Sequence, residues 1–279
     1  MSGLVLVVSY PKSGNTWIRA LLTAFWDGPA ALNINRLRIP NSANLDLLAR
    51  VLGISISDLT SSELAKLRPN AIAQAVAGSK KDWFLKVHDA WLPSPDGEGY
   101  PLSPSSIDKI VYVVRDPRDV AVSLCSHLGM STDEVISLMA NPIYRIGLQL
   151  YGRRPYLPQL LSTWSAHVTS WIDHWQGRLL LVRYEDVLAD PAGQLSRILK
   201  FVGTAHTVQQ VEGAAEATKF ETLQQLERLY GFIERPHSST GFFRMGHAGN
   251  WRTILSAIQA RRIEAAHAEV MHLLNYRTP

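Results

Sequence analysis

The sequence contains a single cysteine and lacks both a long apolar segment and a long run of charge. Cys125 has no second cysteine with which to form a disulfide within the chain, and this fits a reducing compartment. No segment has the roughly 20 apolar residues that a transmembrane helix needs. The first apolar run is too short for a signal peptide, and no Lys or Arg precedes it. We therefore expect a cytoplasmic protein without a membrane span.

Repeats, low-complexity tracts and Gly/Ser-rich linkers are also absent from the sequence. A chain of 279 residues can bury a large core, and without a boundary signal we expect one domain over residues 1–279. The net charge of +4 suits an anionic small ligand. Nucleic-acid binding calls for a basic stripe, whereas Lys80-Lys81 and Arg261-Arg262 are short pairs typical of solvated surface. We expect no nucleic-acid partner.

Four short apolar runs predict strands that are buried on both faces. Each is rich in β-branched or aromatic residues and shows no clean alternation. They are Leu4–Val8, Trp83–Val87, Ile110–Val114 and Leu179–Val182. Because helical segments lie between them, we predict an α/β fold: one domain with a central, mainly parallel β-sheet flanked by helices. Ligands of such sheets bind beyond the carboxyl ends of the strands, so the residues after each strand are the candidate site residues.

Several helices have recognisable ends. Asp116-Pro117 and Asp190-Pro191 each predict an N-cap followed by proline at the first helical position, and Gly203 can end the second of these helices. Residues 60–63 (Thr-Ser-Ser-Glu) form a capping box, and we expect Pro69 to lie beyond the end of that helix.

Two helical faces can be assigned from spacing alone. A last long helix is predicted from about Thr253 to Leu274. Its expected apolar face consists of Ile263, Ala266, Val270, Leu273 and Leu274. A second stripe at helical spacing predicts a helix that packs against the sheet. This stripe consists of Trp164, His167, Trp171 and Trp175.

A candidate anion site follows the first strand, where residues 11–17 read Pro-Lys-Ser-Gly-Asn-Thr-Trp before a helix-compatible segment. A tight glycine turn before a helix N-terminus exposes backbone N–H groups that favour a phosphate. Lys12, Ser13 and Thr16 add donors. In the P-loop of nucleotidases the lysine follows the second glycine, whereas Lys12 precedes Gly14 and the first glycine is missing, which weakens a Mg·ATP interpretation. An ordinary turn with a surface lysine would also explain this stretch.

The third and second strands end in further candidates. Arg115 can form a bidentate contact with a second phosphate, and Ser123 lies about two turns later. Alternatively, Arg115 pairs with Asp116 or Asp119. His88 ends the second strand, two residues after Lys86, and is a candidate general base, although a lone histidine is more often structural. No histidine has convincing ligand spacing with a carboxylate or cysteine, so we predict no metal.

Together these segments resemble the sulfotransferase family that uses 3′-phosphoadenosine-5′-phosphosulfate (PAPS), over nearly the whole chain. Six blocks match in the order of the family: residues 11–17 (the 5′-phosphosulfate loop), 84–88 (the catalytic histidine), 113–123 (the 3′-phosphate motif), 183–186 (a tyrosine near the adenine), 218–220 (a nucleoside contact) and 243–251 (the block over the 3′-phosphate). Two residues depart from the family pattern. Asn15 replaces a common threonine, and its amide can still donate. Met245 replaces a common lysine, which removes one phosphate partner.

The resemblance implies transfer of a sulfuryl group from PAPS to a hydroxyl or amine of a small-molecule acceptor, with adenosine 3′,5′-bisphosphate (PAP) as product. It implies catalytic roles for His88 as general base, for Lys12 and for Lys86. The implied PAPS-binding residues are Lys12, Ser13, Gly14, Asn15, Thr16, Trp17, Arg115, Ser123, Tyr184, Thr218, Phe220, Arg244, Met245 and Gly246. We expect a monomer or homodimer. The competing interpretations are a P-loop kinase and a non-catalytic nucleotide-binding protein.

The acceptor itself is not predicted, because residues 28–80 match no motif. Two Pro-containing segments are candidates for a lid over the acceptor pocket: Leu92–Pro104, directly after His88, and Asn141–Pro158, which contains three tyrosines. The second segment could equally be a surface connection.

Overall fold

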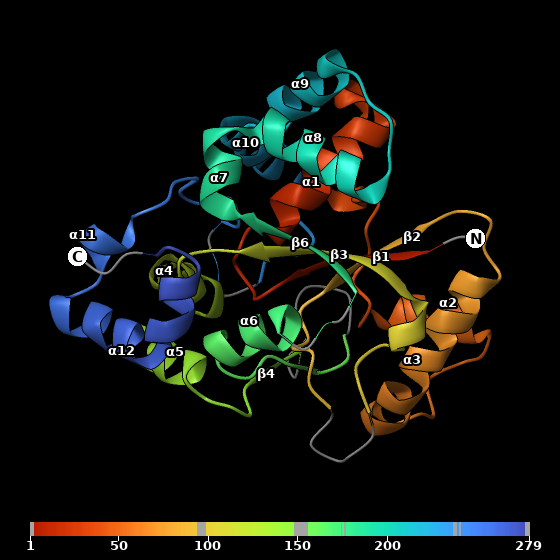
Figure 1. Ribbon diagram of the computed structural model, residues 1–279, viewed down its shortest axis with the longest axis horizontal. Coiled ribbons are helices and arrows are strands. Elements are labelled where there is room, and N and C mark those ends of the chain that lie inside the picture. The colour runs from red at the N-terminus through yellow and green to blue at the C-terminus, as the bar shows by residue number, and fades with distance from the viewer. Residues whose placement is uncertain are drawn as a thin grey trace.

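The fold is built on one parallel sheet. The computed structural model describes residues 3–93, 99–147, 156–173, 175, 177–236, 239 and 241–276. The sheet consists of β1 (Leu4–Ser9), β2 (Trp83–Val87), β3 (Ile107–Val114) and β6 (Arg178–Arg183), in the order β2-β1-β3-β6, and all neighbouring strands are parallel (Figure 1). The four predicted strands are confirmed, although β3 begins earlier than predicted. A separate antiparallel pair is formed by β4 (Arg145–Ile146) and β5 (Gln159–Leu160).

Both faces of the sheet are covered by helices, as Figure 1 shows. Alternate residues of β1 enter two different cores: Leu4, Leu6 and Val8 enter one, and Val5 and Val7 enter the other. The second core packs against α1 (Asn15–Asp27), α8 (Pro191–Val202) and α9 (Val208–Ala217). The first packs against α2 (Leu45–Leu52), α3 (Ser61–Ala77), α4 (Pro117–Leu128), α5 (Thr132–Met139), α6 (Trp164–Ile172) and α12 (Ala257–Leu273). The predicted α/β fold is confirmed.

Short elements complete the chain. The remaining helices are α7 (Tyr184–Ala189), α10 (Phe220–Tyr230) and α11 (Trp251–Ile254), with 3-10 turns η1 (Pro29–Ala31), η2 (Ile34–Arg36) and η3 (Pro104–Ser106). Within the described ranges, no helix combines the length and the apolar character that crossing a bilayer requires.

The predicted N-caps are confirmed. The Asp116 side chain accepts a hydrogen bond from the Arg118 N–H, and the Asp190 side chain accepts one from the Gly193 N–H. Gly203 ends α8 in the left-handed conformation, and Thr60 and Glu63 form both hydrogen bonds of a capping box.

Two helix predictions are wrong. Pro69 lies inside α3 instead of beyond it, because buried residues on both sides, Arg68 and Ile72 among them, hold the helix in place across the proline. The predicted last helix is two helices, since Leu255 is extended and a new capping box at Ser256 starts α12. The buried residues of α12 keep the regular i, i+3/i+4 spacing of one helical face, although the backbone at His267 is non-helical. Ala266 and Leu273 lie to one side of this face and are exposed. The buried residues are Ala260, Ile263, His267, Val270, Met271 and Leu274.

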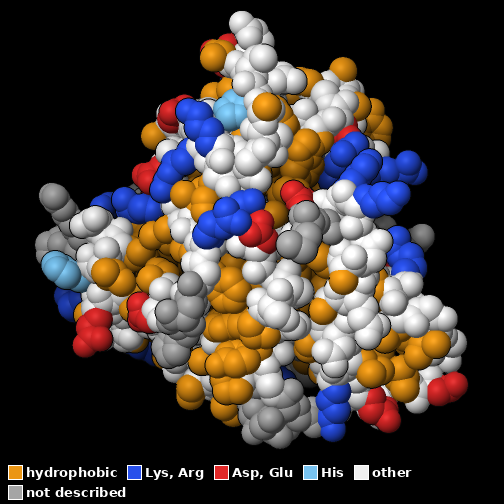
Figure 2. Space-filling view, turned by 45° about the vertical axis from the view of Figure 1, so that its right-hand side comes forward, with side chains coloured by type: hydrophobic (Ala, Val, Ile, Leu, Met, Phe, Trp, Pro, Cys, Tyr) orange, Lys and Arg blue, Asp and Glu red, His pale blue; other side chains and the backbone are white. Residues whose placement is uncertain are grey.

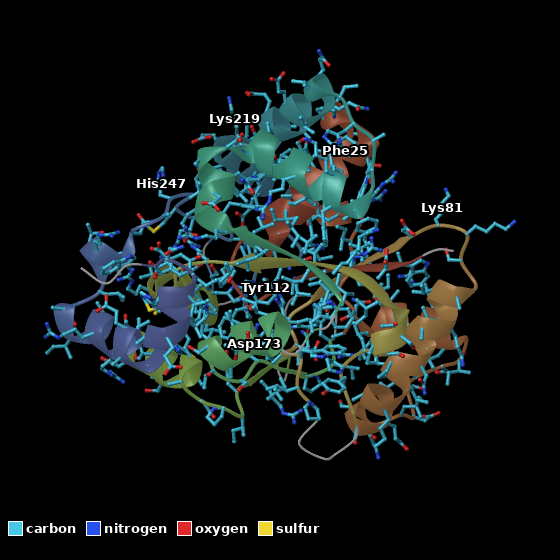
Figure 3. All side chains as sticks on the ribbon, in the orientation of Figure 1. Phe25, Lys81, Tyr112, Asp173, Lys219 and His247 are labelled. Atoms are coloured by element: carbon cyan, nitrogen blue, oxygen red, sulfur yellow. The ribbon has the colours of Figure 1, made fainter. Side chains whose placement is uncertain are left out.

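Three of the four residues of the predicted aromatic stripe lie on one helix, and the prediction is wrong for Trp175. Trp164, His167 and Trp171 of α6 are fully buried against the sheet, and Trp175, which lies after the end of the helix, packs edge-on against Trp91. The predicted surface pairs are exposed, and Lys81 extends away from the body of the molecule (Figure 3). On the face shown in Figure 2, lysine and arginine side chains are dispersed in small groups.

Candidate active site

One cavity lies at the carboxyl ends of the strands, and nearly all the predicted site residues line it. These are Lys12, Gly14, Asn15, Thr16, Trp17, Lys86, His88, Arg115, Ser123, Tyr184, Phe220, Arg244, Met245 and Gly246. The two exceptions are Ser13 and Thr218, which do not line it. The six sequence blocks therefore converge on one place, as the parallel order of β2, β1 and β3 requires.

The loop between β1 and α1 has the features of an anion-binding turn. Gly14 adopts φ of 101°, and Lys12 adopts φ of 66°. The backbone N–H groups of residues 12–16 have no hydrogen-bond acceptor among the described residues. The Ser13 hydroxyl is fully buried and also lacks a partner there. Because buried donors are normally satisfied, this set of free donors fits an anion such as a phosphate.

Gly14 is also fixed by its neighbour. A β-carbon at this position would lie 2.6 Å from the ring of Tyr184, at the start of α7. The position thus combines a left-handed backbone with close ring packing, and both require glycine.

Asn15 behaves differently from the expectation. Its amide nitrogen donates to the Val7 carbonyl at 3.0 Å instead of pointing a donor at the cavity, and its side-chain oxygen is buried without a partner in the described structure. Asn15 therefore fixes the start of α1 against β1.

The charged form of the Lys12 ammonium group is destabilised by its surroundings. Its Nζ lies 3.9 Å from the centre of the Phe242 ring. Burial, followed by the nearby charges of Arg115, Lys86 and Arg244, lowers the pKa of Lys12 to about 7. An anion bound by the loop would reverse this effect, since it would favour the charged form.

Lys86 is held by a carboxylate that the sequence analysis missed. Lys86 Nζ lies 3.1 Å from Glu234 Oε2, and Glu234 also accepts two hydrogen bonds from Arg19 Nη1, at 2.9 and 3.0 Å. Burial alone would raise the pKa of Glu234, but Arg19 and Lys86 hold it well below its usual range. Burial lowers the pKa of Lys86, and Glu234 opposes that change. One carboxylate thus supports two buried cations.

His88 is neutral and its tautomer is defined. Its Nδ1 lies 2.7 Å from the carbonyl oxygen of Ser9, which can only accept, so Nδ1 carries the hydrogen. Burial and the charge of Lys86 hold the pKa of His88 well below its usual value. The second ring nitrogen, Nε2, is therefore unprotonated at neutral pH. His88 lines the cavity, so this tautomer provides a base there.

A buried chain of hydrogen bonds positions the backbone of His88. Tyr112 Oη lies 2.8 Å from His167 Nδ1, and His167 Nε2 lies 3.0 Å from the His88 carbonyl oxygen. Since that carbonyl accepts, Nε2 of His167 carries the hydrogen and Tyr112 donates to Nδ1. Figure 3 shows Tyr112 between the sheet and α6. Burial lowers the pKa of His167 to about 4, which keeps it neutral.

Arg115 does not pair with Asp116 or Asp119, and that alternative is wrong. Asp116 instead pairs with Arg118, which is itself buried. Arg115 donates to the Lys12 carbonyl at 3.3 Å and the His247 carbonyl at 3.0 Å, and its guanidinium lies 4.3 Å from the centre of the Tyr184 ring. Its buried Nε has no partner among the described residues. Arg115 is thus free of carboxylates and available to an anion.

Two carboxylates hold residues 242–251 at both ends, a role that the sequence did not indicate for either of them. Glu227 accepts hydrogen bonds from the backbone N–H groups of Phe242 and Phe243, and Asp119 accepts them from those of Gly249 and Trp251. These contacts place residues 242–251 along the wall of the cavity. Of the two, only Asp119 was named from the sequence, as an alternative partner of Arg115.

Phe220 and Gly246 pack directly on each other. Gly246 has φ of 64°, and a β-carbon there would lie 2.4 Å from the Phe220 ring. Thr218 has an indirect place: its hydroxyl bonds to carbonyls of α9, and its own carbonyl accepts from Trp17 Nε1 at 2.9 Å. Thr218 therefore orients Trp17 and does not itself line the cavity.

The rest of the lining is apolar or neutral. It includes Leu124, His127, Leu128, Ile146, Gly147, Tyr156 and Gln159. Burial and the charge of Lys12 lower the pKa of His127 to about 3, so its imidazole is uncharged. Residues from 141–158 thus contribute to the wall, whereas no described residue of 92–104 does. Tyr151 and residues 94–98 lie outside the described residues.

No group of three or more His, Cys, Asp or Glu side chains that could hold a metal occurs in the described part of the chain.

Comparison with known proteins places the chain in a family. The sulfotransferase domain family matches residues 3–275, so the chain belongs to this family and is a sulfotransferase. Cytosolic sulfotransferase 16 from Arabidopsis thaliana is 29% identical, over 93% of this chain and 73% of the relative. Cytosolic sulfotransferase 17 from the same plant is 27% identical over 94% and 72%, and sulfotransferase 1A1 from Canis lupus familiaris is 25% identical over 98% and 86%.

Solved structures share the fold. Retinol dehydratase in complex with androsterone and the inactive cofactor PAP gives a TM-score of 0.64 at 21% identity, over 96% of this chain and 80% of that chain. Mouse sulfotransferase SULT7A1 complexed with PAP gives 0.63 at 20% identity, over 96% and 84%.

Proposed function

We propose that the cavity binds PAPS and that the protein transfers its sulfuryl group to a hydroxyl or amine of a small molecule. The observation that carries this assignment is the neutral His88, with Nδ1 bonded to Ser9, beside an anion loop of unpaired donors. PAP in the two solved relatives and the flavonol acceptors named for two plant relatives support the donor and the acceptor class.

The donor would be held by its charged groups. The backbone N–H groups of residues 12–16, the Ser13 hydroxyl and Lys12 suit the 5′-phosphosulfate. Arg115, Arg244 and Ser123 suit the 3′-phosphate. Met245 adds no charge, so the 3′-phosphate depends on these three residues.

The chemical step assigns one task to each catalytic residue. His88 Nε2 accepts the proton of the acceptor hydroxyl as its oxygen attacks sulfur. Lys12 stabilises the negative charge that grows on the departing phosphate oxygen, and Lys86 contacts the sulfuryl oxygens. Glu234 keeps Lys86 charged and in place within the apolar cavity.

The test separates chemistry from nucleotide binding. We expect His88→Asn to lower kcat by a factor of about 10²–10⁴, the usual effect of removing a general base, while PAP affinity stays nearly unchanged. Turnover is followed with labelled PAPS and a panel of hydroxyl acceptors, and PAP binding by calorimetry. His272→Asn is the matched control, since His272 is exposed on α12. A His88→Asn protein with near wild-type turnover would refute the assignment.

The remaining expectations belong to the same proposal. The names of the Arabidopsis relatives support a cytosolic location. One domain over residues 1–279 is consistent with the family match, and a monomer or homodimer can be distinguished by light scattering.

A further inference from the structure

A second cavity adjoins the active site. Three residues line both cavities: Asn41, Tyr156 and Glu234. Asn41 forms an isolated bridge with Lys86 at the edge of the sheet, two residues before His88. A molecule in the outer cavity therefore lies next to the catalytic strand end.

The walls of this outer cavity are fixed by hydrogen bonds. The Asn35 side chain donates to the Gly231 carbonyl at 3.1 Å and accepts from the Ile233 N–H at 2.7 Å, which joins η2 to the segment that carries Glu234. The Asn44 side chain, which also lines the cavity, caps α2. The cavity is thus built from residues 34–50 and from the distant segment that carries Glu234.

The outer cavity has an excess of positive charge. Its charged lining consists of Arg19, Arg36, Arg50, Asp46 and Glu234. Glu234 is already shared between Arg19 and Lys86, so it cannot neutralise a further cation. Arg36 and Arg50 are exposed, and neither forms an ion pair within the described residues; Arg50 donates only to the backbone carbonyl of Asp46, at 3.2 Å. Arginine guanidinium groups that form no ion pair with a carboxylate suit an anionic group of a ligand.

The inner cavity differs in character. Leu124, Leu128, Ile146 and Phe242 give it an apolar lining beside the neutral His88. An acceptor that occupies both cavities therefore needs a nucleophilic end, an apolar middle and a polar or charged outer end.

We propose that the acceptor is an amphipathic hydroxy acid: its hydroxyl reaches His88, its apolar part fills the inner cavity, and its anionic group lies between Arg36 and Arg50. The position of the hydroxyl rests on the proposed function, because His88 is assigned there as the base. The anionic group is a new specificity element, and Arg36 and Arg50 are the residues that select it.

The experiment compares matched acids and esters. The probes are 4-hydroxyphenyl alkanoic acids of increasing chain length and their methyl esters, in which the distal carboxylate is replaced by an uncharged group with one extra methyl. Binding is measured by calorimetry on PAP-saturated protein, and turnover with labelled PAPS. We expect one chain length at which the acid binds at least about fivefold more tightly than its ester, because each arginine can form a charge-assisted hydrogen bond.

Variants identify the arginines responsible. Arg36→Gln with Arg50→Gln should abolish the preference for the acid while leaving the affinity and turnover of the methyl ester unchanged. Arg38→Gln is the matched control: Arg38 is two residues from Arg36 but pairs with Asp27 and does not line the cavity. It should keep the full preference.

The outcomes distinguish the two proposals. Acids that bind no better than their esters at every length, including no binding by either, overturn the anionic acceptor. A preference that survives in the double variant overturns the role of Arg36 and Arg50. After either of these two results, transfer of a sulfuryl group to neutral hydroxyl acceptors in the same assays would still support the proposed function. A protein that does not bind PAP contradicts the proposed function instead.

Discussion

Lys12 should take up a proton when the donor nucleotide binds. In the free protein, burial and the charges of Arg115, Lys86 and Arg244 lower the pKa of Lys12 to about 7. A phosphate in the loop adds negative charge beside the ammonium and raises this pKa again. At pH 8 a group with a pKa of about 7 is roughly 90% deprotonated, so binding of PAP should take up nearly one proton per nucleotide.

The sign of the pH dependence follows from this uptake. Below pH 7 Lys12 is charged in both states, and PAP affinity is at its full value. As the pH rises through 7, the free protein loses the proton that the complex keeps, so affinity falls by about tenfold per pH unit until the pKa of the complex is reached. The PAP phosphates, with a second pKa near 6, are already ionised at pH 8 and contribute little to the uptake.

Calorimetry measures this directly. Titrations at pH 8 in Tris and in HEPES, whose ionisation enthalpies differ, give the number of protons taken up. Lys12→Ala should weaken binding and remove the uptake, whereas Lys12→Arg should keep a charge at all these pH values and give affinity that is flat from pH 7 to 9. Equal proton uptake by the wild type and Lys12→Ala would refute the assignment of the shifted pKa to Lys12.

Two further predictions concern groups that support Lys86 and His88. Glu234→Gln leaves two buried cations without their carboxylate, so the free energy of unfolding from urea titration should fall by about 3–5 kcal/mol; an unchanged unfolding midpoint would contradict the buried network. Tyr112→Phe removes the donor to His167 Nδ1 and should cost about 1–3 kcal/mol of stability and lower kcat, with PAP affinity unchanged. A fall in PAP affinity in Tyr112→Phe without a fall in kcat would contradict the positioning of His88 through His167.

The parts of the fold that could be predicted are encoded locally. The strand Leu4–Ser9 and the cap at Asp116 each depend on residues within a few positions of one another, so the sequence pattern contains the whole cause. The start of α12 is also encoded locally. Ser256 and Gln259 form a capping box, so a new helix begins there and the predicted helix is not continuous.

The missed residues depend on contacts across long stretches of chain. Glu234 lies in an irregular segment, and its partners Arg19 and Lys86 are 215 and 148 residues away in sequence. Asp119 accepts from Gly249, 130 residues away. A single carboxylate in a loop has no periodicity or spacing that distinguishes it from a solvated side chain, so only the folded structure identifies its role.

The choice of partner for Asp116 shows why even a local pattern can mislead. Arg115 and Arg118 are both within reach along the chain, and the sequence does not distinguish them. In the structure Arg118 donates through Nε and Nη2 to Asp116, and its guanidinium stacks 3.9 Å from the centre of the Trp251 ring. Trp251 and Glu264, both distant in sequence, hold Arg118 in this position. Arg115 is thereby left for the cavity.

Burial has opposite consequences for the two residues that matter most to the chemistry. For His88 a low pKa is useful, because a base must be unprotonated before it can accept the acceptor proton. For Lys12 a low pKa is a cost, because the leaving group needs a full positive charge. Donor binding removes this conflict, because the phosphate restores the positive charge of Lys12. The charge of Lys12 also lowers the pKa of His127 and so keeps that imidazole neutral. With the donor bound, the same low-dielectric cavity therefore holds the neutral base His88 and a fully charged Lys12.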